Sequence, residues 1–71
     1  MTDRQMDRKE VLKVRLTHLR SEHRDLDEAI LALEEAPAPD MLRLRRLKKR
    51  KLALKDQIAR IEDDLTPDII A

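Results

Sequence analysis

The sequence predicts an all-α fold, an antiparallel two-helix hairpin. First, 44% of the residues are charged and the chain contains no Gly, Cys or aromatic residue, a composition typical of long helices and coiled coils. Second, two stretches carry apolar residues at alternating spacings of three and four. Third, the segment between them, Glu35–Asp40, contains two prolines, which disfavour helix. With 71 residues the chain forms a single domain whose core is marginal without a partner.

The first helix is expected over about residues 3–35. Thr2 and Gln5 fit a capping box at its start, and a frayed terminus is the alternative. Pro37 disfavours helical geometry at the residue before it, so the helix ends near residue 35 or 36. Its apolar stripe, here called the first seam, consists of Leu12, Leu16, Leu19, His23, Leu26, Ile30 and Leu33.

A turn over residues 36–40 leads to a second helix over about residues 41–65. Asp40 is suited to cap this helix, and Pro39 is allowed in a first helical turn. Pro67 stops or kinks it, and the tail 66–71 ends in an apolar Ile69-Ile70-Ala71, which either packs on the first helix or is bound by a partner. The second seam consists of Leu44, Leu47, Lys51, Leu54, Ile58, Ile61 and Leu65.

The two seams match each other in antiparallel register. If Leu33 faces Leu44, every other residue of the first seam faces one of the second, ending with Leu12 against Leu65. The charges agree with this register. The acidic residues 21–35 lie beside the basic residues 40–51, and the basic residues 4–20 lie beside the acidic residues 52–64. Each exposed ion pair contributes only about 0–1 kcal/mol, so such pairs mainly select orientation. An adjacent register also fits except for one like-charged pair, Arg20–Lys55, so the alternation of charged blocks is the stronger indication. The expected flanking pairs are Glu34–Lys48, Asp27–Lys55, Arg20–Glu62 and Glu22–Arg50.

The hairpin is expected to associate into a helical bundle. Two helices alone leave much of each seam open to water, and further apolar side chains lie off the seams. The simplest assembly is a dimeric four-helix bundle. The expected partners are a second copy of the chain and a larger protein. The off-seam apolar residues are Val11, Val14, Leu31, Leu42 and Leu52.

The densest charged motif is the basic run 43–51. It could neutralise phosphates or lie on an anionic membrane surface. The favoured interpretation is a solvated surface balanced by the acidic residues of the first helix, because the basic residues go round the helix and no aromatic side chain is present to stack on bases. The alternative function is a dimeric RNA- or DNA-binding hairpin that also uses Arg15 and Arg20. The candidate contacts to nucleic acid or an acidic partner are Arg43, Arg45, Arg46, Lys48, Lys49 and Arg50.

His23 and Lys51 lie in adjacent layers of the two seams, and together they form what we call the polar layer, which interrupts the otherwise apolar seams. With Asp27 they resemble acid–base machinery. A narrow two-helix seam offers no concave pocket, however, so we interpret the layer as a device that fixes register, with the Lys51 stem buried and its ammonium in water. His18 and Glu22 are too few to define a metal site. We therefore expect no catalytic residue, metal or cofactor.

The sequence shows no signal for secretion or membrane insertion, which favours the cytoplasm. No stretch of the sequence is long and apolar enough to span a membrane, the first residues lack the apolar core of a secretory signal, and there is no Cys. We therefore expect a cytoplasmic location.

Two segments resemble the YdcH-like family of small bacterial proteins. They are Ser21–Asp27, with its Glu-His-x-x-Leu pattern, and Arg46–Ile58, with its Lys-Leu-x-Leu-Lys-Asp-x-Ile pattern. The resemblance covers roughly residues 12–70. It implies a short helical hairpin in a bacterial cytoplasm and no assigned activity. Together with the residues it predicts a non-enzymatic protein that acts through protein–protein association, with an uncharacterised biological role.

Overall fold

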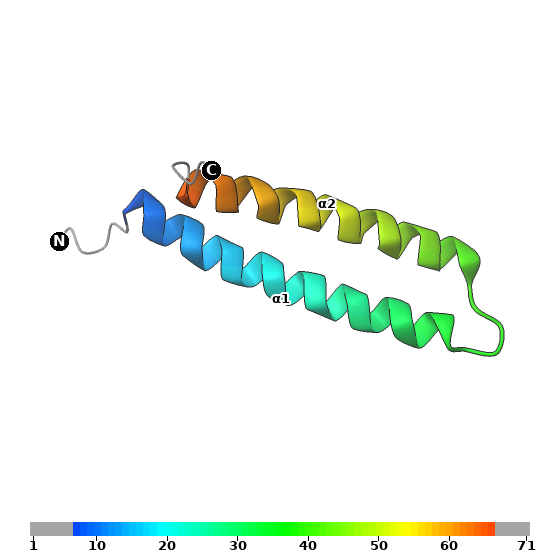
Figure 1. Cartoon of the computed structure of the whole chain (residues 1–71). Coiled ribbons are helices and arrows are strands. Elements are labelled where there is room, and N and C mark those ends of the chain that lie inside the picture. The colour runs from blue at the N-terminus through cyan, green and yellow to red at the C-terminus, as the bar shows by residue number, and fades with distance from the viewer. Residues whose placement is uncertain (1–6, 67–71) are drawn as a thin grey trace.

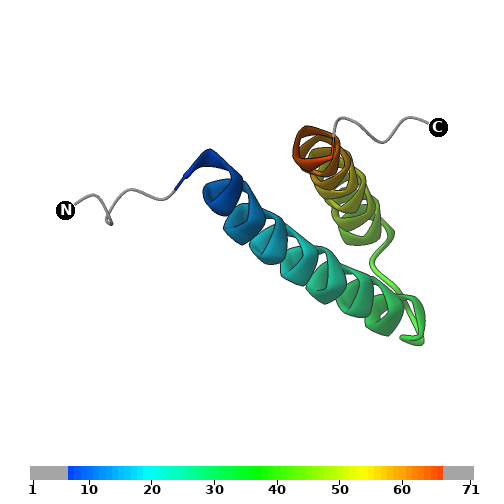
Figure 2. The same cartoon turned by 60° about the vertical axis from the view of Figure 1, so that its left-hand side comes forward.

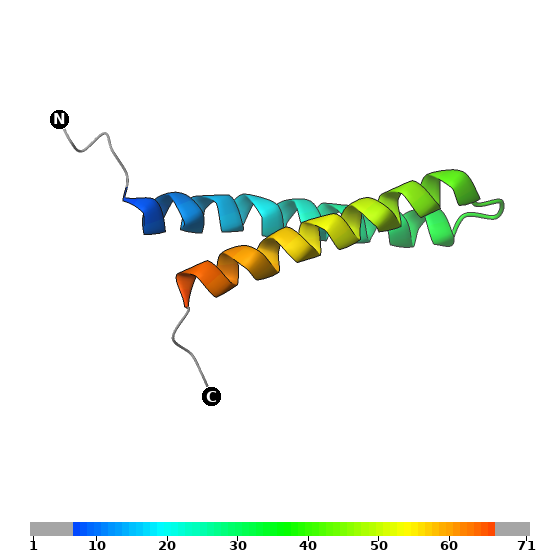
Figure 3. The same cartoon turned by 90° about the horizontal axis from the view of Figure 1, so that it is seen from above.

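The computed structural model describes residues 7–66, which form two α-helices. Helix α1 spans Arg8–Glu34 and helix α2 spans Met41–Leu65. The helices run side by side in opposite directions and are joined at one end by the turn (Figure 1). Figures 2 and 3 show that the two helices cross at a shallow angle. The predicted all-α antiparallel hairpin is confirmed.

Helix α1 begins later than the sequence predicted. Asp7 has extended backbone (φ −64°, ψ 157°) and its carbonyl accepts hydrogen bonds from the amides of Glu10 and Val11 at 3.0 and 3.1 Å. The helix therefore starts at Arg8, and of the earlier part of the predicted range the structure describes Asp7 alone. The predicted capping box at residues 2–5 lies outside the described residues.

The turn is built without left-handed backbone. Helix α1 ends at Glu34, and the amide of Glu35 still bonds the carbonyl of Leu31 at 3.1 Å. No described residue has a positive φ, so the turn does not require the Gly that the sequence lacks. The Asp40 carboxylate then accepts a hydrogen bond from the backbone amide of Arg43 at 3.1 Å and caps α2.

The interior of the hairpin is made by the two seams. Every seam residue is buried or half-buried, including the polar pair His23 and Lys51. Near the open end, Leu16, Leu19, Leu54 and Ile61 form one buried cluster. The packing follows from the seam spacing, which keeps one stripe of each helix on the other. The buried side chains are Leu16, Leu19, Ile30, Leu44, Leu54 and Ile61.

Ion pairs line both flanks of the seams. Arg20 lies 2.6 Å from Glu62 and Lys48 lies 2.9 Å from Glu34, as the sequence predicted. On the opposite flank, Arg8 lies 3.4 Å from Asp64 at the open end. The pairs agree with a single register along the whole hairpin.

Two of the predicted pairs differ in the structure. Asp27 binds Lys51 at 2.6 Å in place of Lys55. Lys51 starts from a seam position and must bring its ammonium out to water, and the Asp27 carboxylate lies where it emerges. Within residues 7–66, Glu22 and Arg50 form no ion pair. The predicted packing of the tail through Ile69-Ile70-Ala71 concerns residues outside the described range.

Candidate interaction surfaces

The polar layer ties the two helices together at mid-length. Lys51 lies in the second seam, and its side chain is 32% exposed. Its Nζ donates a hydrogen bond to Oδ1 of Asp27 at 2.6 Å. This hydrogen bond, together with the positive charge of Lys51 and the nearby His23, holds the pKa of the Asp27 carboxyl below its usual range despite partial desolvation.

His23 occupies the first seam between Leu19 and Leu26 and is half-buried. Within the described residues, its Nε2 is buried and has no hydrogen-bond partner. A buried polar atom without a partner costs stability. Because the Lys51 ammonium is bound by Asp27, the layer presents an interhelical ion pair beside an unpaired imidazole nitrogen.

The side chains of the basic run 43–51 lie on different surfaces of α2. Arg43, Arg46 and Arg50 follow one another along α2 and line, with Leu47, a groove of about 340 Å³, here called the arginine groove. Among the described residues, none of these three arginines forms an ion pair. The other three candidates lie elsewhere: Lys48 binds Glu34, and Arg45 and Lys49 are exposed off this groove. The run therefore includes one continuous arginine row, which the sequence interpretation had not separated from the remaining cations.

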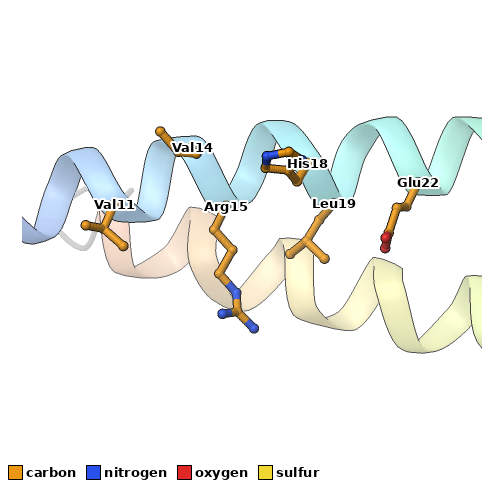
Figure 4. Close-up of a pocket in the computed structure, with 6 residues that line it drawn as sticks. All are labelled: Val11, Val14, Arg15, His18, Leu19 and Glu22. Atoms are coloured by element: carbon orange, nitrogen blue, oxygen red, sulfur yellow. The ribbon is translucent and has the colours of Figure 1, made fainter. Parts of the chain in front are cut away.

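A second groove was missed by the sequence analysis. It measures about 360 Å³, lies along the first half of α1, and is here called the α1 groove. In Figure 4, Val14 and His18 lie along the α1 ribbon, whereas Arg15, Leu19 and Glu22 extend toward α2. Val11 and Val14 are each 48% exposed. The signal that could have found it is the spacing of Val11, Val14 and His18, a short row three and four residues apart outside the seam. The lining residues are Val11, Val14, Arg15, His18, Leu19 and Glu22.

Further large apolar side chains are exposed on the outside of the hairpin. Leu42 and Leu52 are 66% and 65% exposed on α2, and Leu31 and Met41 are also exposed. Leu42, Arg45, Lys49 and Leu52 follow at helical spacing, so the two leucines lie on the same outer side of α2 as two exposed cations. We call this row the α2 outer face.

Metal-ligating clusters and membrane-spanning helices are both absent from the described residues. His18 and Glu22 both line the α1 groove, and no group of three or more metal-ligating side chains occurs in residues 7–66. In the same part of the chain, neither helix contains an apolar stretch long enough to cross a membrane.

The fold and its surfaces define a two-helix antiparallel hairpin protein with an apolar interior, one polar layer and exposed apolar rows. The model of the family described as protein of unknown function (DUF465) matches residues 16–62, which include most of both seams, the turn and the basic run. The chain belongs to this family, and the resemblance to the YdcH-like proteins is consistent with that membership. No curated protein and no solved structure matches the chain.

Proposed function

We propose that the protein is non-enzymatic and acts through protein–protein association, both with itself and with a larger protein partner. The observation that carries the proposal is the set of large apolar side chains left outside the seams. Such side chains on a small protein mark interaction sites when they gather in rows. The α1 groove brings the exposed Val11 and Val14 together, and the α2 outer face exposes Leu42 and Leu52 on either side of two cations.

The size of the interior supports association. Within residues 7–66 the hairpin buries six side chains, all of them Leu or Ile. Small domains bury a low fraction of their surface and gain stability by oligomerisation. A partner helix that covers one of the exposed rows would add apolar burial at roughly 25 cal/mol per Å².

The polar layer supports the absence of catalysis. Lys51 Nζ donates a hydrogen bond to Asp27 at 2.6 Å, a contact between the two helices that explains this lysine without a catalytic role. His23 lies within the seam and lines neither the α1 groove nor the arginine groove. Both residues therefore have a structural explanation as parts of the helix–helix interface.

Self-association is tested by sedimentation equilibrium of the wild-type chain over a wide concentration range. We expect an average mass above that of the monomer, rising with concentration. The larger partner is tested by capture from the native host with the tagged full chain. Leu42→Lys and Leu52→Lys together should remove the captured protein, whereas the control Ala53→Lys, an exposed position on the same helix, should retain it. A monomer at all concentrations that captures no protein would overturn the proposal.

The arginine groove favours a second candidate function, binding of RNA or DNA. Its three guanidinium groups are free of ion pairs among the described residues and follow one side of a helix. If they neutralise phosphates, affinity falls steeply with salt. Arg43→Gln, Arg46→Gln and Arg50→Gln together should weaken binding, and Lys9→Gln, Lys13→Gln and Arg24→Gln, which remove the same charge elsewhere, should weaken it much less. No mobility shift of nucleic acid at low salt would exclude this candidate.

A further inference from the structure

We propose that the α1 groove packs against the same surface of a second copy of this chain. The two α1 helices then lie antiparallel and are related by a twofold axis. The inference rests on the proposed self-association and adds its surface and its register. It commits to residues 11–22 of each chain as the contact.

The hairpin itself provides the template for this contact. Leu16 and Leu19 of α1 are level with Ile61 and Ile58 of α2 in the seam register. Beside these layers, Arg20, which follows Leu19, lies 2.6 Å from Glu62, which follows Ile61. Two layers and one flanking ion pair at this spacing are thus part of the antiparallel helix contact inside the hairpin.

The row in the α1 groove has the same spacing and is complementary to itself. Val11, Val14 and His18 are three and four residues apart, and Ser21 continues the row. Placed antiparallel in the register of the hairpin, Val14 faces the partner's His18 and Val11 faces the partner's Ser21. The residue after Val14 is Arg15 and the residue after Ser21 is Glu22, so Arg15 faces the partner's Glu22. The twofold axis repeats each contact, as an isologous interface requires.

The charges at the ends of the groove select this arrangement. Arg15 and Glu22 both line the groove, and within residues 7–66 neither forms an ion pair. A parallel pair of α1 helices would set Arg15 against the partner's Arg15, which is repulsive. The antiparallel pair sets opposite charges together at both ends and covers Val11 and Val14, each 48% exposed in the single hairpin.

Charge reversal tests both the partner and the register. Arg15→Glu alone sets two carboxylates against each other at both ends of the contact, and Glu22→Arg alone sets two guanidinium groups against each other there. Each variant should raise the dimer dissociation constant about tenfold or more, because two exposed pairs turn from attractive to repulsive. A mixture of the two variants should recover wild-type affinity, because every cross-chain pair is then opposite in charge. Sedimentation of each variant and of the mixture, with helicity checked by circular dichroism, provides the readout.

Two further measurements keep the inference separate from the proposed function. Val14→Lys should weaken dimers at least as much as one charge reversal, whereas Leu52→Lys on the α2 outer face should leave the dissociation constant unchanged. The chain lacks Cys, so Val14→Cys mixed with His18→Cys should form the mixed disulfide in preference to either homodimer. Wild-type dimers that tolerate both reversals and Val14→Lys would overturn the inference and leave association itself intact. A strictly monomeric wild type would overturn the inference together with the self-association part of the proposed function.

Discussion

Replacing His23 by Leu should stabilise the hairpin. The imidazole occupies a first-seam position level with Leu54, and its Nε2 is buried without a hydrogen-bond partner in the described part of the chain. A leucine there would complete the apolar stripe from Leu19 to Leu26. It would also remove the unpaired polar atom from the interface.

The expected gain follows from the cost of that atom. A buried polar group without a partner costs about 1–3 kcal/mol. Leu is also the better helix former by a few tenths of a kcal/mol. The imidazole is only half-buried, which places the gain in the lower part of that range. We expect the free energy of unfolding to rise by about 1–2 kcal/mol, which in a domain of this size raises Tm by about 4–8 °C for each kcal/mol.

Urea and thermal unfolding followed by far-UV circular dichroism at pH 7 measure this change. Wild type and variant are compared at the same chain concentration, because association shifts apparent stability. Thr17→Leu adds a leucine at an exposed position of α1 and should change stability by less than about 0.5 kcal/mol. If His23→Leu were neutral or destabilising with helicity unchanged, the assigned cost of the imidazole would be refuted.

Three other positions give predictions that the same unfolding assay can check. Leu54→Ala should cost about 2–4 kcal/mol because Leu54 is 6% exposed, while Leu52→Ala, two residues away and 65% exposed, should cost little. Asp27→Asn should destabilise at neutral pH, and its difference from wild type should shrink as the pH falls below about 4. The Asp27 pKa is lower in the folded chain, so its contribution is complete above the unfolded value and is lost as the pH drops through the folded one. Asp40→Ala should cost about 1 kcal/mol by removing the cap of α2, and Asp40→Asn should retain most of that stability. An equal loss for Leu54→Ala and Leu52→Ala, a pH-independent effect of Asp27→Asn, or a neutral Asp40→Ala would each contradict the assigned contact.

The seam register could be predicted because helical spacing decides which residues share a face. Two stripes with matching alternations leave one antiparallel alignment in which all layers coincide, and the structure buries or half-buries every residue of both stripes. Flanking ion pairs such as Arg20–Glu62 followed from the same register, because both residues directly adjoin seam positions.

The partner of a long side chain and a surface made of two or three residues were harder to predict than the seams. The sequence paired Asp27 with Lys55 across the flank, but the long Lys51 side chain reaches the same carboxylate from inside the seam. The α1 groove depends on only two exposed valines, Val11 and Val14, beside charged residues. Such a short row does not stand out in a periodicity that the seams dominate. The start of α1 could not be predicted from the sequence, because only the extended backbone conformation of Asp7 shows where the helix begins.

The position of the turn determines how the hairpin closes. Contacts beside the turn, such as Leu33 with Leu44, enclose the shortest loops and have the smallest closure entropy, and each layer further out becomes easier once the previous one has formed. We therefore expect the two helices to zip from the turn toward the open end, a local folding route typical of fast helical proteins. On this route the chain reaches Lys51 and His23 after only two apolar layers, before the buried cluster near the open end can form. If the two seams start to pair in a shifted register, Lys51 and His23 come into the helix–helix contact early. At that stage few layers have formed, so the helices can still separate quickly. We therefore expect the polar layer to disfavour misaligned pairing of the helices early in folding.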